Sequence, residues 1–239
     1  MRPLDAIWVY LASLPLLGLA VTLLAWQAAL WLSRRLRDWP AANPVLIAVA
    51  LVSAGLLASG LPYSAYFAGA QYIHFLLGPA TVALAVPMHA AWGPIRRSAG
   101  AILPALLAGS AVAAVSAILI ARALGGSRDV VLSLAPKSAT TPIAMGVAEQ
   151  IGGNPSLAAI FVMLTGLITV AIGPAIWRVL GITDWRARGL AAGTAGHGIA
   201  TARILLLNET AGAFGGLAIG LNGVVTAVIV PPLVRWLVP

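Results

Sequence analysis

The stretch that decides the fold is Pro136–Gly153, which reads PKSATTPIAMGVAEQIGG and lies between long apolar segments. It contains Lys137, the only lysine of the chain, and it is interrupted by proline and glycine. A charged, irregular segment is costly in hydrocarbon, so within a membrane protein it is by default a functional site. We therefore expect this stretch to mark the site and to shape the fold around it.

The rest of the chain has the composition of a membrane protein. Of its 239 residues, 61% are hydrophobic and 8% are charged, whereas a soluble domain has about a quarter charged residues. Such a chain cannot cover a globular surface with polar groups, so we expect the lipid bilayer to be its solvent. The net charge of +8 comes from arginines near the ends of apolar segments. Because no basic patch with interleaved aromatics appears, the pattern argues against nucleic-acid binding.

Apolar segments of the length needed to cross a membrane, about 20 residues, recur along the chain. Two more are apolar but interrupted: the first interrupted segment is Val130–Gly153 and the second is Gly189–Leu207. The sequence predicts one integral membrane domain, all-α and polytopic, with about six full transmembrane helices plus two broken or re-entrant segments. Residues 1–121 would form a scaffold-like half, and residues 130–239 the half with the site. The six predicted spans are Ile7–Leu32, Pro44–Leu61, Ile73–Trp92, Ala99–Ala121, Leu157–Trp177 and Gly215–Leu237.

The two interrupted segments resemble each other. Thr141 precedes Glu149 by eight residues, as Thr201 precedes Glu209, and a glycine follows three residues later in both. An apolar helix then follows each segment. One interpretation is chance similarity between stretches rich in glycine, alanine and threonine. The other is an internal repeat of a broken segment plus a helix, which is typical of transporters with a site near the membrane midplane.

Loop charges indicate how these segments enter the membrane. The positive-inside rule places the loops with Arg34–Arg37 and Arg96–Arg97 inside, and Pro62–Gln71, which lacks basic residues, as a loop outside. The basic loop after Trp177 joins the inside only if the first interrupted segment dips in and returns. We therefore expect a re-entrant hairpin there and a second one entering from the opposite face, an inverted repeat. Two broken helices that cross fully are the competing prediction.

The polar groups of both interrupted segments suit an anion. Irregular backbone in a bilayer is tolerated where it lines a cavity or is buried in protein, and helix N-termini there offer N–H donors and partial positive charge. Lys137 and Arg203 add full charges, and His197 can donate to a carboxylate or titrate near neutral pH. We predict a site for a small carboxylate that also carries a hydroxyl or keto group. The candidate substrate-binding residues are Lys137, Ser138, Thr140, Thr141, Thr194, His197, Thr201, Arg203 and Asn222, with Glu149 and Glu209 in supporting or coupling roles.

A plainer interpretation of the charges is structural pairing, of Lys137 with Glu149 and of Arg203 with Glu209, and both interpretations are compatible. The three histidines are far apart and no carboxylates cluster with them, so we expect no metal site. The sequence shows no nucleophile–base arrangement, phosphate-binding loop or dinucleotide fingerprint, and we expect neither an enzyme nor a cofactor.

Two glycine and proline patterns concern packing. Gly78–Pro79 and Pro87 should kink or break the predicted span Ile73–Trp92. A small-xxx-small ridge, which allows close helix packing, serves either internal packing or a homo-oligomer. Its members are Gly212, Gly216 and Gly220.

Four stretches together resemble a known family. They are His74–Pro87 (HFLLGPATVALAVP), Pro136–Gly153, Thr194–Arg203 (TAGHGIATAR) and Glu209–Asn222 (ETAGAFGGLAIGLN). They resemble the LrgB/CidB family, which includes the LrgB-like half of the plastid glycolate/glycerate translocator. The resemblance covers nearly the whole chain. Small departures are Gly196, where the family pattern has serine, and Thr210, where it has glycine.

The resemblance implies two competing functions in a multi-pass protein of the bacterial inner membrane. Bacterial members are described as holin-like or antiholin-like regulators of murein hydrolase export and cell lysis. Plant and some bacterial relatives look like carriers of small 2-hydroxy or 2-keto carboxylates such as glycolate, glycerate and pyruvate. The family also implies a small LrgA/CidA-type membrane protein as partner. Because a lytic pore needs no polar interruptions of this kind, we expect a carrier, with a regulator of lysis or a partner subunit without flux as the alternatives.

Overall fold

The computed structural model describes residues 15–36, 44–76, 79, 82–83 and 85–238. Every regular element in these ranges is a helix, and the prediction of a helical membrane protein is confirmed at this level. The number of spans and the inverted repeat stay predictions. Four helices of the described ranges are long and apolar enough to cross a membrane: α2 (Pro15–Arg35), α7 (Trp92–Ala123), α10 (Pro155–Val179) and α12 (Glu209–Leu237).

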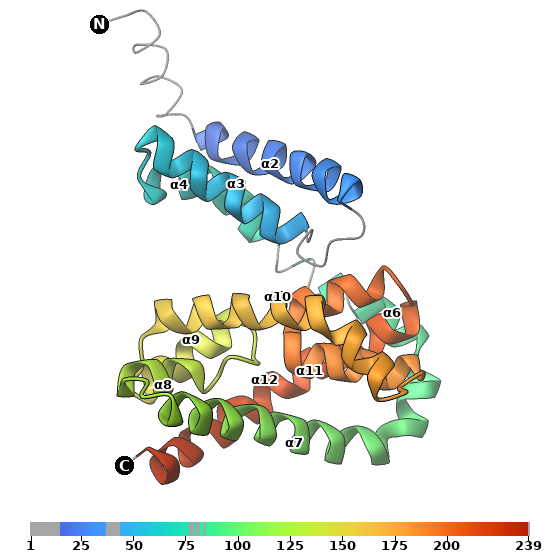
Figure 1. The fold of residues 1–239 in the computed structure, drawn as a ribbon. Helices are drawn as coiled ribbons and strands as arrows, with labels where there is room; N and C mark the ends of the chain where they lie inside the picture. The colour runs from blue at the N-terminus through green and yellow to red at the C-terminus, as the bar shows by residue number, and fades with distance from the viewer. Residues whose placement is uncertain (1–14, 37–43, 77–78, 80–81, 84, 239) are drawn as a thin grey trace, which may run out of the picture. The chain divides into compact units, whose positions relative to one another are not determined.

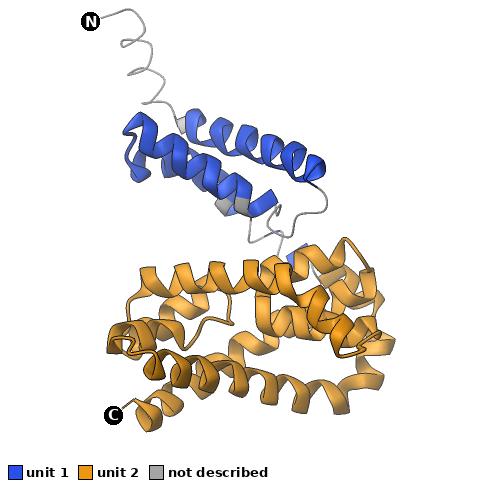
Figure 2. Cartoon of the chain, viewed as in Figure 1, with its two compact units in different colours: residues 1–83 blue, residues 84–239 orange. Residues whose placement is uncertain are grey.

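The chain divides into two compact units, residues 1–83 and 84–239 (Figure 2). In the first unit, α2 packs against both α3 (Pro44–Ser59) and α4 (Tyr63–Phe75). A Cβ atom on Gly18 would come within 3.0 Å of the carbonyl carbon of Tyr66, so α2 and α4 approach closely at this glycine. The hydroxyl groups of Thr22 and Tyr66 form a hydrogen bond of 2.8 Å between the same helices.

One prediction in this part of the chain is wrong. The expected outside loop Pro62–Gln71 is mostly helix, because its small and aromatic residues pack α4 onto α2. The expected span Ile73–Trp92 is interrupted, as its glycine and proline pattern predicts: α4 ends at Phe75, α6 covers Ala85–Ala90, and Trp92 begins α7. Pro87 lies in the first turn of α6, where a missing N–H costs no intrahelical hydrogen bond. Gly78 and the start of the Ile7–Leu32 span lie outside the described residues.

The second unit is built on α7 and α12, which run side by side in the same direction (Figure 1). Near their starts, Phe214 of α12 packs with Ile95 of α7. Near their ends, Val230 of α12 packs with Ile118 of α7. Residues 1–121 were predicted to form a scaffold-like half. Of this half, α7 belongs to the same unit as both interrupted segments.

The first interrupted segment is a helical hairpin made of α8 (Arg128–Leu134), residues 135–140, and α9 (Thr141–Gln150), which we call the first hairpin (Figure 1). It starts where α7 and α12 end, because the Arg128 guanidinium donates to the Val238 carbonyl at 3.2 Å. Its tip reaches the middle of α12, where a Cβ atom on Gly223 would lie 2.6 Å from Ile143. It then returns, since the Asn154 N–H at the start of α10 donates to the hydroxyl group of Ser133 in α8 at 2.8 Å.

The second interrupted segment lies in α11 (Trp185–Leu205), which is broken at His197. Before the break α11 runs alongside α12, with Gly193 against Gly215, and after it the chain turns back so that Leu205 packs on Gly212. We call α11 the second hairpin. It starts beside the beginning of α7, where Arg186 donates to Ser98 at 3.5 Å. The two hairpins thus enter the unit from opposite ends of α7 and α12.

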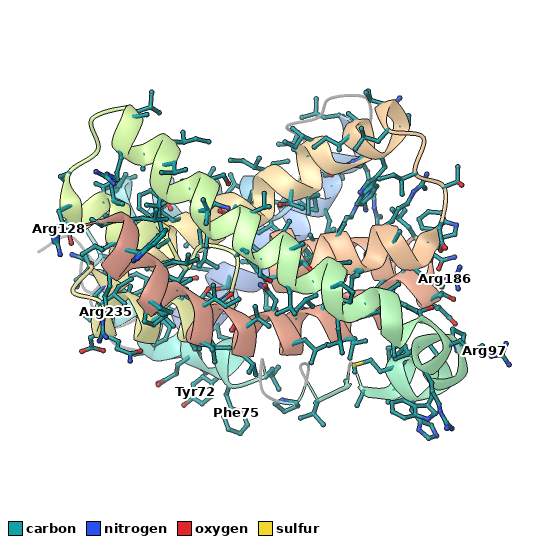
Figure 3. The ribbon with its side chains drawn as sticks, turned by 90° about the horizontal axis from the view of Figure 1, so that it is seen from below. Tyr72, Phe75, Arg97, Arg128, Arg186 and Arg235 are labelled. Carbon is teal, nitrogen blue, oxygen red and sulfur yellow. The ribbon has the colours of Figure 1, made fainter. Side chains whose placement is uncertain are left out.

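Figure 3 shows these two ends through the labelled arginines. Arg128 and Arg235 lie at the end where the first hairpin starts, and Arg97 and Arg186 lie at the other. Of the predicted glycine ridge, Gly212 packs internally on Leu205. A role of the ridge in a homo-oligomer stays a prediction.

The residue-by-residue match between the two segments does not hold throughout. Glu149 is in the last turn of α9, whereas Glu209 is the first residue of α12. Gly152 forms a turn with a φ of 83°, whereas Gly212 is helical. The similarity persists at a coarser level, because each hairpin leads into a long helix with an asparagine cap, Asn154 for α10 and Asn208 for α12.

Candidate functional site

Asn222 joins the two hairpins at the middle of α12. Its side chain is buried, with 1% of its surface exposed. Its amide nitrogen donates to the main-chain carbonyls of Ser138 at 2.8 Å and Thr194 at 3.2 Å, one from each hairpin. Its amide oxygen accepts from the Ser110 hydroxyl group of α7. Protein groups occupy both its oxygen and its nitrogen. Asn222 therefore holds the two hairpins and α7 together, and its amide is not free to bind a ligand.

Val162 of α10 joins the hairpins a second time. Its side chain packs with Ala139 and Ala144 of the first hairpin. Its main-chain carbonyl accepts from Nε2 of His197 in the second hairpin at 2.9 Å. One turn further along α10, a Cβ atom on Gly166 would lie 2.9 Å from the imidazole, so a glycine is needed where the ring packs.

Lys137 places the positive charge of the first hairpin at its tip. The side chain is half-buried, and its Nζ donates to the Ser138 hydroxyl group at 3.3 Å. It is near enough to His197 for an electrostatic interaction. Among the described residues it forms no ion pair with Glu149, which is exposed at the far end of α9. The predicted structural pairing of these two charges is therefore absent.

The N-terminus of α9 lies at the same tip. Thr140 is the N-cap, and its side chain makes no capping hydrogen bond. The first N–H groups of a helix lack intrahelical partners and carry partial positive charge. Thr140 and Thr141 are half-buried, so their hydroxyl groups border this end of the helix. The tip combines a lysine, an uncapped helix N-terminus and hydroxyl groups, which together can bind an anion.

Three predicted residues lie away from the tips. Arg203 is exposed in the last turn of α11, because the chain has already turned back at His197. Glu209 is exposed at the first position of α12, and within the described chain it forms no ion pair with Arg203. Thr201 is 1% exposed, and its hydroxyl group packs against Gly215 without a hydrogen-bond partner among the described residues.

Some residues of the site were missed by sequence reasoning. Ser110 is a polar residue in the middle of an apolar span, and this signal alone marks it for attention. Gly166 lies in the Thr165–Pro174 stretch of α10 without any distinguishing motif. The Val162 carbonyl is a main-chain group, and no side-chain pattern can indicate its role.

The entry of the second hairpin is fixed by charges and aromatic rings. The Asp184 side chain accepts from the Arg186 N–H at 2.8 Å and caps α11. Arg186 also pairs with that carboxylate at 2.7 Å, and these hydrogen bonds hold the pKa of Asp184 below its ordinary value. The Arg188 guanidinium stacks over Trp185 at 4.7 Å and over Trp177 of α10 at 5.8 Å. These contacts hold the end of α10 against the start of α11.

Comparisons with known proteins match nearly the whole length of the chain. The model of the LrgB-like family matches residues 22–236. An uncharacterized protein of Bacillus subtilis, YxaC, is 34% identical over 226 residues, which are 95% of this chain and 97% of the relative. YwbG, another uncharacterized protein of that organism, is 35% identical over 82% of this chain and 87% of its own length. A protein of Bacillus mycoides named antiholin-like protein LrgB is 30% identical over 91% of this chain and 94% of its own length. No solved structure matches. The chain therefore belongs to the LrgB-like family.

Proposed function

We propose that the chain is a membrane transporter of small 2-hydroxy or 2-keto monocarboxylates of the glycolate, glycerate and pyruvate type. The observation that carries the proposal is the meeting of the two hairpin tips, where the Asn222 side chain of α12 binds the Ser138 carbonyl of one and the Thr194 carbonyl of the other. Lys137 of the first tip is within electrostatic range of His197 in the second. The lysine would bind the carboxylate, and hydroxyl groups and the imidazole would bind the neighbouring oxygen of the substrate.

The groups at the two tips carry a free-energy cost in a membrane. A half-buried lysine without a carboxylate partner and two interrupted helices are costly in a bilayer. A lytic pore needs oligomerising helices and no such constellation. Transporters, in contrast, bind anionic substrates with the N-termini of interrupted helices near the membrane midplane. The groups at the tips fit this second use.

Membrane topology is part of the proposal. The two hairpins would be re-entrant from opposite faces, as in an inverted repeat, because they start at opposite ends of α7 and α12. Arginine is more frequent at the end with Arg97 and Arg186 than at the end with Arg128 and Arg235. The positive-inside rule then assigns the former end to the cytoplasm. The protein would reside in the bacterial inner membrane.

The test is uptake of labelled glycolate, glycerate and pyruvate into proteoliposomes of the purified chain. We expect saturable uptake that Lys137→Gln lowers at least about tenfold. Absence of saturable uptake together with release of large dyes would instead favour a pore.

The second candidate function is regulation of lysis, and it is favoured by the name antiholin-like protein LrgB of a relative. In that case the chain would bind a small LrgA/CidA-type membrane protein and show no carboxylate flux. Reconstitution with and without such a partner separates the two functions, because a carrier that needs its partner gains flux on addition, whereas a regulator binds without flux.

A further inference from the structure

His197 has an unusual backbone conformation that fixes where its ring lies. Its φ of 41° and ψ of −136° fall outside the helical region, and Gly196 and Gly198 flank it. The side chain is 5% exposed. The ring is held against α10 by its hydrogen bond to the Val162 carbonyl and by the space above Gly166. Its orientation at the tip is therefore defined by two independent contacts.

The hydrogen bond to Val162 also defines the tautomer. A main-chain carbonyl can only accept, so Nε2 must carry the proton at this contact of 2.9 Å. In the neutral ring Nδ1 is then an acceptor. A buried imidazolium without a counter-charge is costly, and the charged group that acts on this ring among the described residues is Lys137, which is itself positive.

Nδ1 is accessible. Among the fully enclosed side-chain nitrogen and oxygen atoms of the described residues, Thr201 Oγ1 is the one without a hydrogen-bond partner. Nδ1 of His197 also makes no hydrogen bond to another described residue, so it is not fully enclosed. An acceptor lone pair of the ring is thus left without a partner among the described residues.

We infer that His197 is a specificity-determining residue and that its Nδ1 favours 2-hydroxy over 2-keto monocarboxylates. The inference rests on the proposed transport function. With the carboxylate on Lys137, a hydroxyl group on the next carbon can donate to Nδ1. A keto oxygen at that position can only accept, so it would face a lone pair and leave both acceptors unsatisfied. We expect a preference of roughly tenfold, the size of one neutral hydrogen bond.

The experiment compares lactate with pyruvate, a matched pair that differs in this oxygen. Dissociation constants are measured by calorimetry on the purified full chain. His197→Gln retains a donor for Val162 but places nothing at Nδ1, whereas His197→Asn places an amide there that can accept or donate. The φ of 41° and ψ of −136° lie outside the left-handed region that asparagine tolerates, so thermal unfolding of each variant is measured first. Lys137→Gln is the control and should weaken both acids alike.

We expect lactate to bind wild type about tenfold more tightly than pyruvate. His197→Gln should lower lactate affinity to that of pyruvate, and His197→Asn should bring the two affinities together. An unchanged ratio in both variants would overturn the inference while leaving the proposed function intact. Binding of neither acid to the wild-type chain would overturn the proposed function, and the inference with it.

Discussion

The two hairpins reach the same point of the molecule by different means. The first uses a loop of residues 135–140 between two short helices, and its polar groups are side chains and carbonyls of that loop. The second breaks at a single residue, His197, whose backbone turns at positive φ between two glycines. Similar geometry therefore does not require the same local sequence. A loop can carry a lysine, whereas a one-residue break depends on neighbours that leave space for its ring.

This difference assigns different tasks to the two hairpins. Under the proposed function, the first hairpin acts through the charge of Lys137, and none of its non-glycine residues has positive φ among those described. In the second, the essential features are the backbone turn and the ring that bonds to Val162. Charge removal should therefore affect the first hairpin in function, and small steric changes should affect the second in both stability and function.

The largest effect is expected from removing the charge of the first hairpin. Lys137→Gln should lower carboxylate uptake at least tenfold, because the variant loses the cation at the tips, and a charge-assisted contact contributes about 1.5–3 kcal/mol. Arg203→Gln is the matched control, since Arg203 is exposed and away from the tips, and its uptake should stay within about twofold. Uptake in proteoliposomes measures both. Equal losses in the two variants would contradict the placement of Arg203 outside the site.

A methyl group on α10 tests the second hairpin. Gly166→Ala would place a Cβ atom 2.9 Å from the His197 ring and from Ile199, and such overpacking costs about 1–3 kcal/mol. Gly146→Ala in α9 is the control, because no atom lies within 4 Å of its new methyl group, and it should be neutral or stabilising by up to about 1 kcal/mol. Thermal unfolding in detergent reports both. A stable Gly166→Ala variant with normal uptake would show that the ring does not pack here.

Asn222 is expected to matter to both hairpins at once. Asn222→Ala removes the donor to the Ser138 and Thr194 carbonyls and the acceptor for Ser110. The loss should destabilise the protein by about 1–3 kcal/mol, towards the low end if lipid-embedded reference states find other partners. Asn222→Asp keeps the acceptor and removes the donors. If it were as stable as wild type in thermal unfolding, the link between the hairpins would be refuted.

The return of the first hairpin depends on one glycine with positive φ. Gly152→Ala should destabilise by about 1 kcal/mol, because a φ of 83° disfavours any side chain. Gly220→Ala in α12 is the control, with open space around its new methyl group. The two variants are compared in the same unfolding assay. Equal melting temperatures would argue against the turn at Gly152.

The smallest effect, and one of opposite sign, is expected at Thr201. Its buried hydroxyl group has no hydrogen-bond partner in the part of the chain that the structure describes, so Thr201→Val should leave stability unchanged or raise it by up to about 1 kcal/mol. Uptake should be unaffected, since the residue is enclosed against Gly215. A loss of uptake in a stable variant would restore Thr201 to the substrate site.

Hydropathy predicted the long helices well because lipid-facing helices are apolar nearly all round. The spans Leu157–Trp177 and Gly215–Leu237 lie within α10 and α12. Hydropathy alone reads Ile73–Trp92 as one span, whereas its glycine and prolines predict the interruption that the structure has. The loop expected at Pro62–Gln71 is wrong, because composition does not reveal that a weakly polar stretch packs as a helix. At Pro62–Gln71 the packing of α4 on α2 stabilises a helix where a loop was expected.

The site was predicted in part. Lys137, Ser138, Thr194, His197 and Asn222 lie together because each stands at, or binds to, an interruption that the sequence shows. Arg203 and Glu209 do not, because the chain reverses at His197 and carries them back to the end where α11 began. A sequence shows an interruption but not the angle at which the chain continues.

The meeting of the two tips is the central claim, and cysteine cross-linking tests it most directly, because the chain has no native cysteine. Ser138→Cys with Thr194→Cys is treated with a short bifunctional maleimide, and the chain is then cut at a protease site inserted in the loop 180–183. We predict that the two fragments stay joined. Glu149→Cys with Glu209→Cys is the control pair, and its fragments should separate because these residues lie at opposite ends of α12. Joined fragments in the control pair and separated fragments in the tip pair would show that the two tips do not meet.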